Sequence, residues 1–271
     1  TIHEPNLSAG NSFGHSIIDF MFHAMQSVEL KLGEKNNDLR KNPVVFVRWS
    51  RAVSLLTKGG WKEFFDELGQ TPRVVLVPCN LAFHYGSQVL QNDPTYKETP
   101  PHLQLHYVLF AVDLKHLSVR CYDSAFVYDS VDHRRASYIQ ETLRNQLDLE
   151  LCEWLRHGSA LTMTSFDIKS TDCYQYPAAP GDHGVMVICH AVLLHLSYRN
   201  VHEVQRTGIC ERHEEDDLNV DEGALRYLFS NMKDIKLRIA KAILHKGFTM
   251  QRGNNQLWPA HAHHMYDQAP Y

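Results

Sequence analysis

The stretch from Gly184 to Leu196 is apolar on almost every side of a helix. A helix without a polar face cannot lie on a surface, so the rest of the chain must cover it from several directions. It begins directly behind a Gly-Asp-His-Gly turn, in which Asp182 can cap the free N–H groups of the first helical turn. Such junctions display reactive side chains, because the positive end of the helix dipole activates a thiolate there. The residue displayed here is His183.

Length and charge limit the class of protein. The 271 residues, of which 44% are hydrophobic, can bury a full core and fit one large domain. The formal net charge is -4 and no long basic run occurs. Because phosphate binding needs clustered Lys and Arg, we expect no nucleic-acid partner. The chain begins at Thr1 rather than at methionine, so we expect a processed or excised part of a longer protein.

The cysteines and the hydropathy pattern indicate the compartment. No CxxC spacing occurs, and the six cysteines stand mostly in apolar surroundings, which is typical of free thiols in a reducing compartment: Cys79, Cys121, Cys152, Cys173, Cys189 and Cys210. No apolar run of about 18 residues is present, so we expect no membrane partner and a location in the nucleus or cytoplasm.

Hydrophobic periodicity predicts short strands alternating with helices. The predicted helices are residues 15–32, 50–68 with an interruption at Gly59-Gly60, 134–156 and 222–245, and the predicted strands are 44–47, 73–78 and 160–167. We expect one domain over residues 1–246, with insertions at about 86–102 and at the polar, acidic stretch 197–222. A His-rich tail, residues 247–271, follows this domain.

Residues 105–122 form the clearest predicted hairpin. If Leu114 and Lys115 make its two-residue turn, the ladder places His106 opposite Asp123. Cβ atoms of opposed residues lie roughly 5 Å apart on the same face of a sheet. An imidazole and a carboxylate at this separation can form an oriented hydrogen bond.

These segments together resemble the ubiquitin-like-protein-specific cysteine proteases, the SUMO protease family that shares its fold with adenovirus endopeptidase. The resemblance covers most of the chain. Four family motifs have a counterpart here in chain order: Ser12-Phe13-Gly14-His15 for Trp-Leu-Asn/Ser-Asp, His106-Tyr107 for His-Trp, Tyr122-Asp123-Ser124 for Tyr-Asp-Ser, and Gln175…Asp182-His183-Gly184 for Gln…Asp-Cys-Gly. The closing helix, residues 238–244, resembles the plant, often transposon-related, branch of the family.

The resemblance implies a fold and a set of roles. The fold is α+β, papain-like, of the SUMO-protease and adenain type, with a central mixed sheet flanked by helices. His106 corresponds to the base, Asp123 to the group that orients it, Gln175 to the oxyanion donor and residue 183 to the nucleophile. The family needs no metal or other cofactor, and its partner is a ubiquitin-like protein.

Three departures from the family pattern decide the functional expectation. The nucleophile position is His183, the tryptophans that form a narrow tunnel over the Gly-Gly tail of the substrate become Phe13 and Tyr107, and the loop from Gln175 to His183 is longer. Losing the nucleophile of such a triad costs on the order of 10⁶ in turnover. We therefore expect an inactive protease homologue that binds a protein partner of the ubiquitin-like class.

Two other functions stay open. The chain is also compatible with a ubiquitin-like-protein isopeptidase whose nucleophile was replaced by His183 to trap substrate. The third possibility is a structural subunit of a larger complex, in which the two insertions make the contacts. The sequence does not fix the oligomeric state.

Several residues admit another role. Cys173 or Cys189 could replace the missing nucleophile, although Cys189 should be a buried structural thiol with a raised pKa. His106 and His183, with Asp123 or Asp182, could hold a metal ion. Asp182 serves first as a helix cap. The tail histidines are expected to belong to a flexible segment rather than to a site: His261, His263 and His264.

Overall fold

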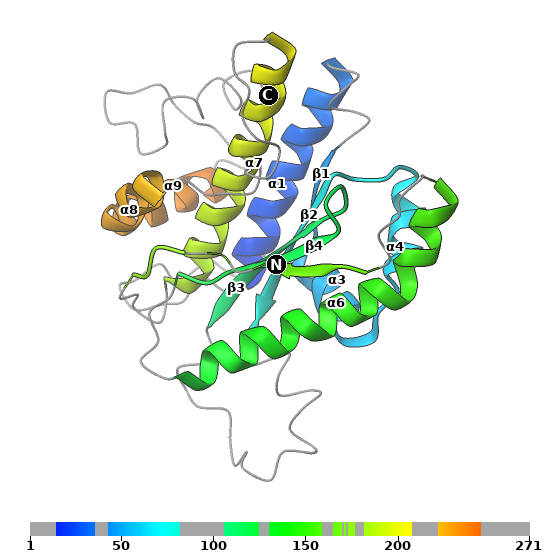
Figure 1. The fold of residues 1–271 in the computed structure, drawn as a ribbon. Helices are drawn as coiled ribbons and strands as arrows, with labels where there is room; N and C mark the ends of the chain where they lie inside the picture. Colours follow the sequence, from blue (N-terminus) through cyan, green and yellow to red (C-terminus); the bar gives the residue numbers. More distant parts are fainter. Residues whose placement is uncertain are drawn as a thin grey trace.

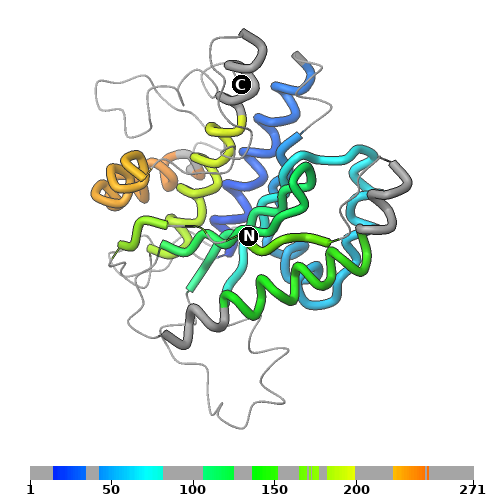
Figure 2. The backbone as a smooth tube through the Cα atoms, in the orientation of Figure 1, coloured from blue at the N-terminus to red at the C-terminus, as the bar shows by residue number. Residues whose placement is uncertain are grey.

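The structure is a computed structural model, which describes residues 15–35, 43–81, 106–124, 130–158, 165–169, 171, 173–176, 182–207 and 222–244. Its elements are α1 (His15–Lys35), β1 (Val44–Phe46), α3 (Trp49–Lys58), α4 (Trp61–Leu68), β2 (Val74–Asn80), β3 (Tyr107–Asp113), β4 (Ser118–Tyr122), α6 (Ser130–Gly158), β5 (Asp167–Lys169), α7 (His183–Thr207), α8 (Glu222–Ser230) and α9 (Met232–Leu244). Helices flank a central sheet on both faces (Figures 1 and 2).

The sheet is mixed, as expected, and its strands follow the order β1-β2-β3-β4-β5. The two outer pairs are parallel and the two inner pairs are antiparallel. Every residue of β2 and β3 is buried, because successive side chains enter different cores. Val108 and Phe110 pack with α3, α4 and α6, whereas Leu109 and Ala111 pack with α1 and α7. The α+β class predicted from the sequence is confirmed.

Helix α7 occupies the core, as its apolar sequence predicts. Each residue from His183 to Leu196 is buried. α7 lies against α1 and β3, and α8 and α9 lie beside it (Figure 1). The helix continues to Thr207 and so enters the stretch 197–222 predicted as an insertion, of which residues 208–221 lie outside the described part. Among the described helices, none combines the length and apolarity that crossing a membrane requires.

The hairpin forms with a turn that differs from the predicted one. Its turn spans residues 114–117, and β3 pairs with β4 so that Leu109 faces Tyr122. The carboxylate of Asp113 accepts the backbone N–H groups of Lys115 at 2.9 Å and His116 at 3.1 Å, which favours the longer turn. The predicted register is therefore wrong by two residues. A shift of two keeps every side chain on its predicted face.

Two other boundaries also differ from the prediction. The last helix is divided into α8 and α9 at Asn231, whose N–H donates to Leu228 while its carbonyl accepts the N–H of Ile235. The strand predicted at residues 160–167 overlaps the observed strand β5 only at Asp167, and residues 160–164 lie outside the described part. β5 pairs in parallel with β4. The predicted loop 86–102 and the His-rich tail 247–271 lie outside the described residues.

Side chains of α1 accept hydrogen bonds from the backbone of β1, the edge strand of the sheet. Gln26 accepts the N–H of Phe46 at 2.8 Å, and Glu29 accepts the N–H of Val44 at 2.9 Å. The second oxygen of Glu29 lies 2.7 Å from Nε2 of His195 on α7. Burial lowers the pKa of His195, so a neutral ring donates this hydrogen bond. One buried carboxylate thus joins α1, β1 and α7.

Replacing Glu29 tests this junction. Glu29→Ala leaves the Val44 N–H and the neutral His195 ring without this acceptor. At about 1–3 kcal/mol for each unsatisfied buried donor, we expect a loss of about 2–6 kcal/mol in unfolding free energy. The neighbouring residue Leu30 is 57% exposed, and Leu30→Ala should change stability by no more than about 0.5 kcal/mol. Urea unfolding followed by circular dichroism measures both. Equal midpoints for the two variants would contradict the assignment.

Candidate functional site

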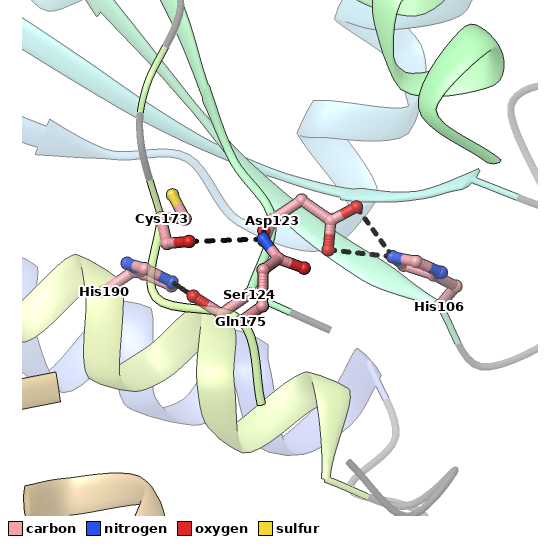
Figure 3. Close-up of polar contacts among 6 residues, drawn as sticks. All are labelled: His106, Asp123, Ser124, Cys173, Gln175 and His190. Carbon is pink, nitrogen blue, oxygen red and sulfur yellow. Dashed lines mark hydrogen bonds and ion pairs between the residues drawn. The ribbon is translucent and has the colours of Figure 1, made fainter. Parts of the chain in front are cut away.

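The centre of the candidate site is the pair formed by His106 and Asp123. His106 directly precedes β3 and is fully buried, and Asp123 directly follows β4. Nε2 of His106 lies 3.0 Å from each carboxylate oxygen of Asp123 (Figure 3). The carboxylate therefore fixes the orientation of the ring and leaves the other ring nitrogen, Nδ1, for a different contact.

The two residues meet along a diagonal of the ladder. Because Leu109 faces Tyr122, the register continued by one step sets Asp123 beside Val108 rather than beside His106. Diagonal neighbours on one sheet face remain within reach of long side chains. The sequence thus predicts the contact between His106 and Asp123 but places the two residues on the wrong rung of the ladder. The contact forms nevertheless, because a shift of two residues leaves both side chains on the same face.

The ring of His183 also contacts that of His106. The ring centroids of the two histidines are 4.8 Å apart, with an interplanar angle of 72°. His183 is the first residue of α7 and is 6% exposed. Nδ1 of His106 has no hydrogen-bond partner among the described residues. His106 thus contacts both Asp123 and His183, the residues that the sequence predicts beside it.

Asp182 stands at the N-cap position of α7. Its carbonyl accepts the N–H of Met186 at 3.0 Å, which is the first hydrogen bond of the helix. Its carboxylate forms an ion pair with Lys236 of α9. The sequence carries no signal that brings residue 236 to this position, because the contact depends on how α9 packs against α7.

Gln175 supports the backbone of the acid. Its side-chain Nε2 donates to the carbonyl oxygens of Asp123 at 2.9 Å and Cys173 at 3.3 Å (Figure 3). The next N–H along the chain, that of Tyr176, donates to the carbonyl of Ser124 at 2.8 Å. Both amide hydrogens of Gln175 are thus engaged by backbone oxygens. The oxyanion role stays a prediction, because it requires this amide to turn towards a substrate.

A buried contact between Ser124 and His190 was not predicted from the sequence. The hydroxyl oxygen of Ser124 lies 2.8 Å from Nε2 of His190, on the second turn of α7 (Figure 3). Burial lowers the pKa of His190 to about 4, and the nearby charge of Asp123 opposes this shift. The contact fixes the segment that carries Asp123 to the helix that carries His183. The sequence did contain a signal for this contact, namely a histidine, His190, inside an otherwise apolar helix.

Aromatic side chains pack beside the site. Tyr107 is buried, and its ring meets that of Trp49 at a centroid distance of 5.6 Å. Trp49 also stacks on His15 at 6.1 Å. The motif comparison paired Tyr107 with Phe13, which lies outside the described residues. Trp49 was not among the predicted site residues, because it belongs to α3 and approaches Tyr107 only in the folded chain.

The two cysteines that the sequence offers as other nucleophiles, Cys173 and Cys189, lie away from His106. Cys189 is buried, and burial raises its pKa to about 12, which confirms a structural thiol. Cys173 is half-buried and lies across Asp123 from His106 in Figure 3. Its sulfur is 3.7 Å from the hydroxyl of Thr171. Neither thiol therefore occupies the nucleophile position beside His106.

The geometry gives little support to a metal site. Within the described residues, no three His, Cys, Asp or Glu side chains are arranged to hold a metal ion. His106 and His183 are close enough to act as two ligands, but Asp123 binds Nε2 of His106 and so acts on the ring rather than on an ion. A carboxylate in this place fixes the tautomer of a histidine.

Comparisons with known proteins add a likeness in structure. No protein-family model and no curated protein matches the chain. Among solved structures, a de-sumoylating protease has a TM-score of 0.49 at 12% identity, covering 89% of this chain and 84% of that one. The C-terminal Ulp1 protease domain in complex with Smt3, the yeast ortholog of SUMO, has a TM-score of 0.46 at 16% identity, covering 90% and 81%.

A third solved structure belongs to the same group. The catalytic domain of the Ulp1-like SUMO protease of Chaetomium thermophilum has a TM-score of 0.44 at 15% identity, covering 90% of this chain and 76% of that one. These likenesses concern the overall fold. The roles of individual residues in this chain depend on the contacts described above.

The buried His190 makes stability depend on pH. Its pKa falls from 6.5 in the unfolded chain to about 4 in the fold, so its contribution is complete above pH 6.5 and is lost as the pH falls from 6.5 towards 4. His190→Gln lacks this titration. Between pH 6.5 and 4 its unfolding free energy should therefore fall less steeply than that of the native chain, and the two slopes should differ by up to about 1.4 kcal/mol per pH unit.

Denaturant unfolding across this pH range measures the difference between the two slopes. His23→Gln is the matched control, because His23 is exposed on α1 and its replacement should leave the native slope. A native slope in His190→Gln would show that the pKa of His190 does not change on folding.

Proposed function

We propose that this chain is a homologue of the ubiquitin-like-protein-specific cysteine proteases that is catalytically inactive towards peptide and isopeptide bonds and acts as a protein-binding module. The contact between His106 and His183, together with the hydrogen bond of Asp123 to Nε2 of His106, carries the proposal. It supports residue 183 as the former nucleophile position. The base and the acid that orients it are retained, whereas the sulfur is absent.

The surroundings of the site support binding rather than proteolysis. The half-buried thiol of Cys173 lies across Asp123 from His106, and Cys189 is buried inside α7. An imidazole beside His106 is bulkier than a thiol and is a poor replacement for it as a nucleophile towards an amide. Binding requires only the surface around the site, which includes the half-buried Trp49, whose ring packs against the buried Tyr107.

The partner that we propose is a ubiquitin-like protein, which would place its C-terminal tail against Trp49 and His15. Aromatic rings offer a large apolar contact for such a tail at low entropic cost. Within the described part of the chain, Cys79, Cys121, Cys173 and Cys189 form no disulfide, in keeping with the reducing compartment that we propose, the nucleus or cytoplasm.

A cleavage assay tests the loss of activity. The native chain should not cleave a ubiquitin-like fusion, and a ubiquitin-like probe with a C-terminal electrophile should not label it, because the site lacks a thiolate. The variant His183→Cys restores a thiol beside His106 and Asp123, so it should gain labelling by the probe. It should not regain efficient cleavage, because Phe13 and Tyr107 stand where the tunnel tryptophans of the family would be. His190→Cys places a thiol on the same helix away from His106 and is the control. Cleavage by the native chain above background would refute the proposal.

A binding assay tests the partner. We expect the native chain to bind a SUMO-type or related ubiquitin-like protein in isothermal titration calorimetry, and Trp49→Ala to weaken binding by at least about tenfold as an aromatic contact is lost. The control Leu149→Ala changes an 84% exposed residue of α6 and should bind as the native chain does. Circular dichroism checks that each variant is folded. Equal affinity of both variants would exclude this surface.

The retained acid–base pair also favours a second candidate function. An isopeptidase whose nucleophile has been replaced by histidine would keep the pair of His106 and Asp123 together with substrate affinity. A His183→Cys variant with strong isopeptidase activity would support this candidate. A variant that binds but does not cleave would favour the binding module.

A further inference from the structure

We propose that His183 is a nucleophile for activated acyl groups, so that the chain hydrolyses aryl esters and thioesters although it cannot cleave amides. This activity goes beyond the proposed binding function, because it needs no protein partner. It assigns a chemical role to the substituted position itself. The substrate class is an acyl group attached to a good leaving group, either a phenolate or a thiolate.

The geometry supplies a nucleophile and a base in contact. The rings of His183 and His106 meet edge to face at a centroid distance of 4.8 Å. Asp123 engages Nε2 of His106 with both oxygens at 3.0 Å, so Nδ1 is the nitrogen left for proton transfer. Nδ1 of His106 is buried and has no hydrogen-bond partner among the described residues. A base with one oriented nitrogen and one available nitrogen can activate water.

The position of His183 adds to this arrangement. It is the first residue of α7, where backbone N–H groups of the first helical turn are not used within the helix. Such groups can stabilise the negative oxygen that develops when a carbonyl is attacked. In its neutral form an imidazole is nucleophilic through the ring nitrogen that carries no proton.

The reaction balances with water as the second substrate. A ring nitrogen of His183 attacks the acyl carbon, the N–C bond forms, and the C–O or C–S bond breaks with loss of a phenolate or thiolate. The acyl-imidazole is then attacked by water, from which Nδ1 of His106 takes a proton. Cleavage of the N–C bond releases the carboxylic acid and restores His183. The proton passes from His106 to solvent.

The leaving group determines which substrates react. Thiols and phenols have pKa values of about 8.5 and 10, so their anions depart from the tetrahedral adduct in competition with imidazole. An amine departs only after protonation, so the adduct of an amide expels imidazole and returns to substrate. Replacement of sulfur by imidazole should therefore change the substrate class rather than remove all acyl-transfer chemistry.

Small substrates test the assignment. We expect the native chain to hydrolyse p-nitrophenyl acetate and an acetyl thioester. His183→Ala should lower the rate at least about tenfold, and Asp123→Asn should lower it by a similar factor through the orientation of His106. His23→Ala removes an exposed histidine of α1 and should keep the native rate, which corrects for surface imidazoles. An anilide with the same acyl group should not react.

Mass spectrometry locates the intermediate. The variant His106→Gln lacks the base for deacylation, so an acetyl group should accumulate on His183 and should be released by hydroxylamine. This readout separates a nucleophile from a residue that only supports the fold. The proposal is overturned if His183→Ala hydrolyses both substrates at the native rate, or if the native chain and His106→Gln carry the acetyl group elsewhere.

Failure here would leave the binding proposal intact. The ester assay contains no ubiquitin-like protein, so its outcome is independent of partner affinity. Conversely, a chain that hydrolyses thioesters but binds no ubiquitin-like protein would keep the chemistry of His183 and lose the proposed partner.

Discussion

Burial of the first half of α7 is the constraint on which the remaining structure depends. Each residue from His183 to Leu196 is covered, so α1, the sheet, α8 and α9 must all pack against this helix. Removing that many apolar side chains from water contributes about 1.5–3 kcal/mol for each large residue. The helix start is then held close to the beginning of β3, where His106 stands.

Polar side chains inside this apolar layer set the positions of its neighbours. His195 binds Glu29, which also accepts a backbone N–H of the edge strand β1. His190 binds Ser124, the residue after Asp123. Each histidine is buried and therefore needs a partner, since an unpaired buried polar group is costly. These two contacts join α7 to α1 on one side and to the acid of the site on the other.

Contacts around Asp123 give the candidate site its geometry. Asp123 orients the ring of His106, and Ser124, Gln175 and Tyr176 hold the backbone around this carboxylate. In the function that we propose, the altered group is the nucleophile, which is an imidazole rather than a thiol. Because the contacts around Asp123 do not involve His183, the proposed substitution would leave the arrangement around it in place. Chemistry and binding could then change separately at this position.

The amino-acid sequence by itself determined the helices and strands and the contacts between residues that are close in the sequence. The apolar pattern of residues 184–196 identifies the core helix, and alternation along residues 105–122 places His106 and Asp123 on one face, because side-chain period is a local property. Even there the turn at Asp113 shifted the register by two residues, since its side chain, rather than the strand pattern, fixes the turn.

Only the tertiary structure decided which distant residues surround the site. Lys236 reaches Asp182, Trp49 reaches Tyr107, and His190 reaches Ser124. None of these contacts has a periodic signature, because each depends on the angle and depth at which helices pack on the sheet. The division at Asn231 and the engagement of Gln175 by backbone carbonyls have the same origin, namely hydrogen bonds whose partners come together only after the chain has folded.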